Sequence, residues 1–245
     1  MNHSHRYRER IYPAYTALHT PEATSPEWQP TKKATKLLLS RFKPWLPERK
    51  DAACLDVACG TGTLLLALKE AGYTNLHGVD TSEQQVSVAA HILSAVVHDD
   101  AINYLGKHPK RFDLITAIDI IEHFDKNEVF DFVDALYQAL QPGGRLIVQT
   151  PNAGSPFFGI VGHGDFTHEI AFTPESLQRI MAVAGFAGFE ACECRPCFHG
   201  LKSGVRSFLW HILRLMLAIF NLVETGTTGS GIWTRVFVAK VVKPV

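Results

Sequence analysis

The sequence CLDVACGTGT occupies residues 54–63, and a segment of helical character follows it directly at 64–71. An apolar run thus leads into a turn that contains Gly60 and Gly62, and the turn leads into a helix. Glycine lets a backbone pass close to a ligand, where a Cβ atom would collide. The first turn of the helix offers free N–H groups and the positive end of its dipole to an anionic group. The stretch therefore predicts a buried strand that ends in a ligand-binding turn.

The same alternation continues on both sides of this stretch. Runs typical of strands are expected at 54–58, 76–80, 95–98, 112–119 and 145–150, with a last pair at 188–195 and 232–241. Helical segments separate them, and Asp125 with Glu128 and Thr173 with Pro174 mark two helix starts. This order predicts an α/β fold with a mostly parallel sheet covered by helices on both faces.

The bulk composition narrows the classes of function. Among 245 residues, 24 lysines and arginines balance 24 aspartates and glutamates, and no basic run stands out. We therefore expect no nucleic-acid partner and favour a neutral small molecule or a glycan. Five cysteines, an odd number, favour a reducing cytoplasm over a disulfide scaffold. The first ten residues lack the apolar core of a secretory signal, which also predicts a cytoplasmic location.

Three acids at successive strand ends indicate what the turn binds. The third glycine of a dinucleotide-binding turn is missing, and Asp56 would repel a pyrophosphate but suits a cationic amino-acid moiety. Asp80 follows about 20 residues later, where an acid accepts hydrogen bonds from ribose hydroxyls. Asp100 can accept from an adenine amino group. The carboxyl ends of parallel strands share one edge of a sheet, so these three acids should meet there.

The motifs LDVACGTG, GVD, HDDA, FDLITAIDIIEH and LQPGGRLIVQTPN resemble those of the class I S-adenosylmethionine-dependent methyltransferases over roughly residues 50–195. The resemblance implies a Rossmann-like seven-stranded sheet with a reversed last hairpin, and S-adenosylmethionine as cofactor. It also implies a set of cofactor contacts, namely Asp56, Gly60, Gly62, Asp80, Asp100, Ala101 and Asp119. One position departs from the family pattern, because Ala58 stands where the first glycine is usual.

The segment after the fourth expected strand carries Asp119, Glu122 and His123. Their spacing of three and four residues would place them on one face of a helical turn. They could hold a divalent metal such as Mg²⁺, or His123 could act as a base with Asp119 as a supporting catalytic acid. This block also resembles the ubiquinone-pathway O-methyltransferases, whose acid-x-x-Glu-His segment is linked to a divalent metal. Alternatively, Glu122 and His123 only begin a helix and shape the cofactor pocket.

The loop after the fifth strand contains His163, Asp165, His168 and Glu169. Transfer of a methyl group to oxygen needs a base near neutral pKa, and we expect His168, beside Glu169, to serve ahead of His123. With the tyrosines near the start, this loop resembles methyltransferases of polysaccharide biosynthesis. That resemblance makes the arm and helix at 1–48 a candidate lid for the methyltransferase domain at 49–245, with Tyr12 and Tyr15 against the cofactor.

The predicted function is therefore O-methylation of a sugar hydroxyl on a glycan or glycan precursor. One alternative is an aromatic, quinone-type small molecule as the acceptor, which the acid-x-x-Glu-His block favours. Another, from a different class, is a module that binds S-adenosylmethionine without catalysis.

Two further features suggest other roles. Cys192, Cys194 and Cys197 lack a fourth partner at zinc spacing, so we expect them to be structural. The insertion at about 203–225 contains the most apolar run, 208–223, with Arg214 inside it. This run is shorter than the roughly 20 apolar residues of a membrane span. We expect a helix packed on the sheet or against a second subunit in an oligomer. The alternative is an interfacial helix that holds the enzyme at the inner membrane face near a lipid-linked substrate.

Overall fold

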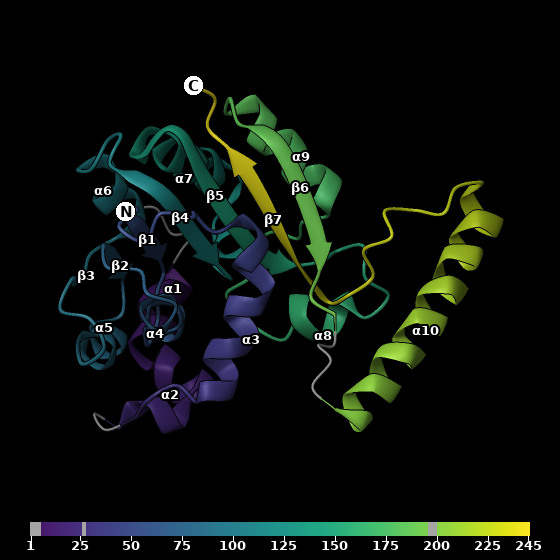
Figure 1. The fold of residues 1–245 in the computed structure, drawn as a ribbon, viewed down its shortest axis with the longest axis horizontal. Coiled ribbons are helices and arrows are strands. Elements are labelled where there is room, and N and C mark those ends of the chain that lie inside the picture. The colour runs from purple at the N-terminus through teal and green to yellow at the C-terminus, as the bar shows by residue number, and fades with distance from the viewer. Residues whose placement is uncertain (1–5, 26–27, 196–199) are drawn as a thin grey trace.

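The computed structural model describes residues 6–25, 28–195 and 200–245, and its centre is one seven-stranded sheet (Figure 1). The strand order is β3-β2-β1-β4-β5-β7-β6. Strands β1 to β5 run parallel, whereas β7 is antiparallel to both of its neighbours. The strands are β1 (Cys54–Val57), β2 (Leu76–Asp80), β3 (Val96–His98), β4 (Phe112–Ile118), β5 (Leu140–Pro151), β6 (Ala187–Glu193) and β7 (Val236–Val242). The Rossmann-like sheet and its reversed last hairpin are thus confirmed.

Helices cover both faces of the sheet and form two separate cores. One core joins the sheet to α3 (Lys32–Phe42), α4 (Thr63–Glu70) and α5 (Glu83–Ala90). The other joins it to α6 (Ala101–Gly106), α7 (Lys126–Ala139) and α9 (Pro174–Val183). All four residues of β1 are buried, as expected of a central parallel strand with helices on both sides.

Side-chain caps set the helix starts that the sequence marked. Asp125 and Glu128 form a reciprocal capping box at the start of α7. Thr173 caps α9 with Pro174 at its first turn, and Gly185 follows the helix with a φ of 94°. Asp100 caps α6, because its side chain accepts a hydrogen bond from the Asn103 N–H.

The N-terminal arm is built from short helical segments. It consists of α1 (Arg6–Ile11), η2 (Tyr12–Ala14), α2 (Tyr15–His19) and η3 (Pro21–Thr24). Pro21 is the first residue and Pro13 the second residue of a short 3-10 turn, where a missing N–H breaks no hydrogen bond. These two prolines are therefore compatible with the helical turns in which they lie.

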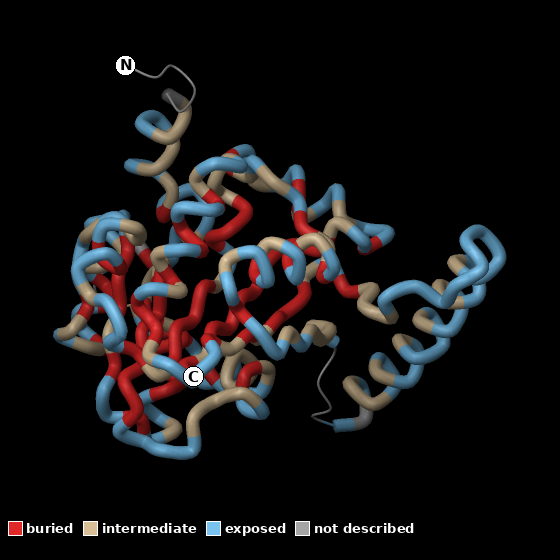
Figure 2. Tube along the Cα trace, turned by 90° about the horizontal axis from the view of Figure 1, so that it is seen from above, coloured by how far each residue is buried: buried red, intermediate tan, exposed pale blue. Residues whose placement is uncertain are grey.

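The apolar helix near the C-terminus is longer and more exposed than expected. It runs as α10 (Leu201–Thr225) and stands to one side of the sheet and its covering helices (Figures 1 and 2). By length and composition it could cross a membrane, with a mean hydropathy of 1.4, and none of its apolar window is buried. The expected packing on the sheet is therefore wrong. Cys192 and Cys194 do pack against the α3–α5 core, whereas Cys197 lies outside the described residues.

Candidate active site

A cavity of about 240 Å³ opens at the carboxyl ends of the parallel strands. Of the predicted cofactor contacts, six line it: Asp80, Asp100, Ala101, Asp119, Tyr12 and Tyr15. Other lining residues include Arg8, Ala58, Asp99, Ile120, His123 and Phe124. The structure thus brings together residues of the arm with the ends of β1, β2, β3 and β4.

Asp80 joins the glycine turn to this cavity. Its Oδ2 accepts from the Gly60 N–H and its Oδ1 from the Ser82 N–H, both at 2.8 Å. Burial raises the pKa of Asp80, and the backbone donors of Ser82 and Gly60 oppose that rise. A carboxylate held by two backbone N–H groups has a fixed position, which suits it to orient a ligand.

The two glycines shape the turn from behind the cavity. Gly60 and Gly62 have φ values of 53° and 81°, a left-handed conformation that favours glycine. A Cβ atom on Gly62 would also lie 3.2 Å from the Cβ atom of Ala89 in α5. Neither glycine lines the cavity, so both act through the backbone and packing. Ala58 does line it, with a φ of 55° that an alanine rarely adopts.

Asp56 lies beneath the turn, away from the expected cofactor contact. It is 3% exposed, and its Oδ1 accepts from the Thr116 hydroxyl at 2.6 Å. The register of β1 with β4 places these two residues opposite each other. Burial raises the pKa of Asp56 to about 7. Asp56 does not line the cavity. It instead supports the glycine turn from below, through its buried hydrogen bond with Thr116.

Asp119 does not share a helical face with Glu122 and His123, although its spacing predicted that it would. Its φ is 49°, and the 3-10 turn η5 (Ile121–His123) begins only two residues later. The Asp119 carboxylate accepts from the Gln149 Nε2 at 2.9 Å and lines the cofactor cavity. The expected shared face with Glu122 and His123 is therefore wrong, because a left-handed residue turns the chain before the helical turn starts.

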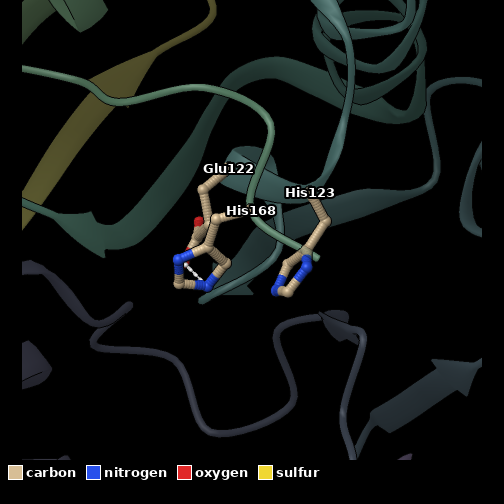
Figure 3. A group of neighbouring side chains, drawn as sticks. All are labelled: Glu122, His123 and His168. Carbon is tan, nitrogen blue, oxygen red and sulfur yellow. Dashed lines mark ion pairs between the residues drawn. The ribbon is translucent and has the colours of Figure 1, made fainter. Parts of the chain in front are cut away.

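His168 takes the place beside Glu122 and His123 that Asp119 was expected to fill (Figure 3). One ligand atom from each of these three side chains lies within 4.8 Å of the others. Glu122 is 1% exposed, and its Oε2 accepts from the Thr150 hydroxyl at 3.0 Å. Its Oε1 is buried and has no hydrogen-bond partner among the described residues, and it lies 4.0 Å from the Nε2 of His168. Burial, and then the nearby Asp119, raise the pKa of Glu122.

A polar chain sets the tautomer of His123. The Thr167 hydroxyl donates to Asp165 Oδ1 at 2.6 Å and lies 2.9 Å from His123 Nδ1. The hydrogen-bond pattern therefore assigns the proton of His123 to Nδ1 and leaves a lone pair on Nε2. The Tyr15 hydroxyl also donates to Asp165, at 2.7 Å. Burial lowers the pKa of His123 to about 4, and the adjacent His168 contributes.

His168 is oriented by a backbone carbonyl group. Its Nδ1 lies 3.3 Å from the carbonyl oxygen of Gly162, which assigns the proton to Nδ1 and a lone pair to Nε2. Its acidic neighbour is Glu122, whereas Glu169 accepts a hydrogen bond from the Tyr7 hydroxyl of the arm. Although Glu169 is the next residue in the sequence, its carboxylate is directed to the arm and not to His168.

Arg8 links the N-terminal arm to the site. No sequence motif predicted this role. Its guanidinium donates to both carboxylate oxygens of Glu128, at 2.7 and 2.8 Å, and to the carbonyl oxygen of His123 at 2.7 Å. A bidentate pair of this kind fixes geometry as well as charge. Sequence reasoning also missed Thr167 and the orienting role of Asp165. A hydroxyl next to a candidate base in the same loop was the available clue.

Comparisons with known proteins now identify the family. The family described as "Methyltransferase domain" matches residues 28–191. The chain belongs to the class I S-adenosylmethionine-dependent methyltransferases. A solved S-adenosylmethionine-dependent methyltransferase from Archaeoglobus fulgidus shares the fold of this methyltransferase, with a TM-score of 0.64 and 23% identity. That match covers 85% of this chain and 94% of the other.

Part of the chain is similar in sequence to known O-methyltransferases. The mitochondrial ubiquinone biosynthesis O-methyltransferase of Rattus norvegicus is 30% identical over 153 residues, 54% of this chain and 44% of the rat protein. The ubiquinone biosynthesis O-methyltransferase of Thiobacillus denitrificans is 31% identical over 176 residues, which cover 60% of this chain and 75% of that protein. The chain spans about half the length of the first curated relatives it matches.

The three-residue cluster of this methyltransferase fits a divalent metal ion by its donor set. Glu122 Oε1 is an orphaned buried oxygen, and the two imidazoles keep a lone pair on Nε2. Two imidazoles with one carboxylate suit Zn²⁺ or a similar ion, since Mg²⁺ prefers oxygen ligands. The set therefore departs in two ways from the predicted one, with His168 replacing Asp119 and a nitrogen-rich donor set in place of a magnesium site.

Proposed function

We propose that this methyltransferase transfers a methyl group from S-adenosylmethionine to a hydroxyl oxygen of an aromatic, quinone-type small molecule. The observation that carries the proposal is the cluster of Glu122, His123 and His168 beside the cofactor cavity. The rat and Thiobacillus relatives, both named for ubiquinone biosynthesis O-methylation, support the same acceptor class.

The cavity walls also favour a flat acceptor. Tyr12, Tyr15 and Phe124 line the cavity together with His123, and the Tyr15 ring packs edge-on against the His123 ring. Aromatic walls suit an aromatic ring by stacking and by edge-to-face contact. The glycan acceptor rested on the loop around Asp165 and His168. In the structure, Asp165 is occupied with Thr167 and Tyr15, so it is not free to bind sugar hydroxyls.

His123 supplies the base in this proposal. Because burial lowers its pKa to about 4, the imidazole is neutral at pH 7 and its Nε2 can accept a proton. The acceptor oxygen attacks the methyl carbon, the carbon–sulfur bond breaks, and its electron pair stays on sulfur as S-adenosylhomocysteine forms. The hydroxyl proton passes to Nε2 of His123. The ionised Asp165 then stabilises the imidazolium through Thr167.

In an alternative, metal-bound form of the site, Glu122, His123 and His168 would hold a divalent ion. Nε2 of His123 would then be a ligand, and the acceptor hydroxyl would lose its proton to water instead of to His123. When bound, such an ion would supply Lewis acidity that lowers the pKa of the acceptor hydroxyl. The lowered pKa of His123 keeps its imidazole neutral and available as a ligand, and Glu122 would give up the proton that its burial favours.

The proposal is tested with methyl-labelled S-adenosylmethionine and two acceptor classes. Catechol and 3,4-dihydroxybenzoate represent aromatic hydroxyls, and methyl glucoside represents sugars. Each is tested with chelator, Zn²⁺ or Mg²⁺. We expect label in the aromatic products, and stimulation by Zn²⁺ that Glu122→Gln abolishes and the exposed control Glu175→Gln keeps. Label in methyl glucoside alone would contradict the acceptor class. Cofactor binding without any labelled product would support the non-catalytic alternative.

A further inference from the structure

Helix α10 presents its polar side to the domain and its apolar side to solvent. Arg214 Nε forms an ion pair with Glu193 Oε2 at 3.1 Å, and its Nη2 donates to the carbonyl oxygen of Gly231. Asn221 donates from Nδ2 to the carbonyl oxygen of Thr227 at 2.7 Å. A helix of a soluble domain buries its apolar stripe, so α10 has the opposite arrangement.

The apolar side of α10 is broad and continuous. Its exposed large side chains are Val205, Phe208, Leu209, Ile212, Leu213, Leu215, Met216, Ile219, Phe220, Leu222 and Val223. At roughly 100° per residue, these positions cover an arc of about 180°, half of the helix surface. The arc holds no acidic side chain, because Glu224 lies beyond its edge. A patch of this size on a soluble domain marks an interaction site.

The width of the arc distinguishes a lipid surface from a second copy of the chain. Two paired helices bury a seam of roughly 100° on each, so a dimer through α10 would leave nearly half of the arc in water. A helix lying in the plane of a lipid–water interface submerges its whole apolar half. A spanning orientation conflicts with the contacts of Arg214 and Asn221, which would draw the domain into hydrocarbon.

Charge around α10 complements phosphate headgroups. Lys202 and Arg206 are exposed at its first turns. On its polar side, a second cavity of about 640 Å³ is lined in part by Arg41 and Arg195, whereas Arg214 in the same cavity is paired with Glu193. Cationic side chains at the level of the headgroups strengthen binding to anionic lipids.

The helix also lies at the edge of the sheet that carries the active site. Strand β7 is antiparallel to both β5 and β6, so β6 ends at the same edge as β5, and α10 follows β6. The Ser155 hydroxyl donates to the Trp233 carbonyl oxygen at 3.1 Å, which ties the loop after β5 to the segment after α10. In that loop, Phe157 and Ile160 are themselves more than half exposed.

We propose that α10 is an interfacial membrane helix that seats the methyltransferase on a lipid surface containing anionic phospholipids. Its apolar half enters the headgroup–acyl boundary, and its polar stripe stays with the domain. This inference does not depend on the acceptor class proposed above. It explains why eleven large apolar side chains face outward on one helix of an otherwise well-packed domain.

Vesicle co-sedimentation of the full chain tests the proposal. Vesicles of phosphatidylcholine alone are compared with vesicles that also contain phosphatidylglycerol. The wild type should sediment with both and more strongly with the anionic vesicles. The double variant Phe208→Ser/Phe220→Ser should lose at least about tenfold in partition coefficient. Val183→Ser removes a comparably exposed apolar side chain from α9 and should bind as the wild type does.

The double variant Lys202→Gln/Arg206→Gln should weaken binding to anionic vesicles by roughly fivefold per charge and leave binding to phosphatidylcholine unchanged. Equal S-adenosylmethionine affinity in all variants shows that each is folded. A wild type that sediments with neither vesicle would overturn the proposal. So would a dimer in sedimentation velocity that Phe208→Ser/Phe220→Ser dissociates, with no vesicle binding by either form.

Discussion

The cofactor half and the acceptor half of the site are built in different ways. The cofactor half uses short loops that follow β1, β2 and β3 within residues 58–101. The acceptor half joins the arm, the turn after β4 and the loop after β5, with hydrogen-bond partners such as Tyr15 and Asp165 150 positions apart. Local motifs therefore predict the first half, whereas the second exists only once the chain has folded. In the acceptor half, a buried acid has a raised pKa and a partly buried histidine a lowered one.

The largest expected effect lies in the acceptor half. His123→Ala removes the proposed base and should lower kcat by about 10²- to 10⁴-fold. S-adenosylmethionine affinity should change little, since the acids that we propose as cofactor contacts remain. Steady-state rates with an aromatic acceptor, together with calorimetric titration, measure both quantities. The exposed His91→Ala serves as the matched control. An unchanged kcat would remove His123 from the mechanism.

The opposite pattern is expected in the cofactor half. Asp80→Asn weakens a charge-assisted contact and should lower S-adenosylmethionine affinity by about ten- to a hundredfold. With saturating cofactor, kcat should stay close to the wild-type value. Asp51→Asn changes an exposed aspartate in the same way and should leave the affinity unaltered. If Asp80→Asn lowered kcat but kept its S-adenosylmethionine affinity, the proposed division of roles between the two halves would be wrong.

The strands and their order were predictable because local patterns determine them. Strand β2 matches its expected bounds, and the caps of α7 and α9 lie where the sequence marked them. The acceptor half was less predictable. No local pattern shows that Asp119 takes a positive φ or that Arg8 reaches Glu128, because both follow from contacts distant in sequence. The hydropathy of the sequence predicted helix α10, but it did not predict whether protein or lipid contacts its apolar side.

Buried ionisable groups of the acceptor half should also affect stability. Glu122 retains its proton in the folded chain at pH values where the unfolded chain has lost it, because burial raises its pKa. The free energy of unfolding therefore falls as pH rises above the ordinary value of 4.5. Glu122→Gln removes this penalty, so its Tm should exceed the wild-type Tm by a few degrees at pH 8 and by less at pH 5. Thermal unfolding at both pH values decides the sign, with Glu175→Gln as the control.

The smallest effect is expected at the turn of the cofactor half. Ala58 pays the cost of a left-handed φ, and glycine adopts that conformation freely. Ala58→Gly should raise the free energy of unfolding by up to about 1 kcal/mol, since part of the relief is offset by the more flexible unfolded chain. Urea unfolding measures the change. A clear loss of stability would mean that the methyl group of Ala58 is needed for packing.

The central claim is that the two halves face each other across the cofactor. A crystal structure of the protein with S-adenosylhomocysteine tests it most directly. The account predicts ribose hydroxyls on Asp80, the adenine beside Asp100 and Ala101, and the sulfur turned toward His123, with room for one hydroxyl oxygen between them. A sulfur directed away from His123, with Glu122 and His168 equally remote, would contradict the assignment of the acceptor half.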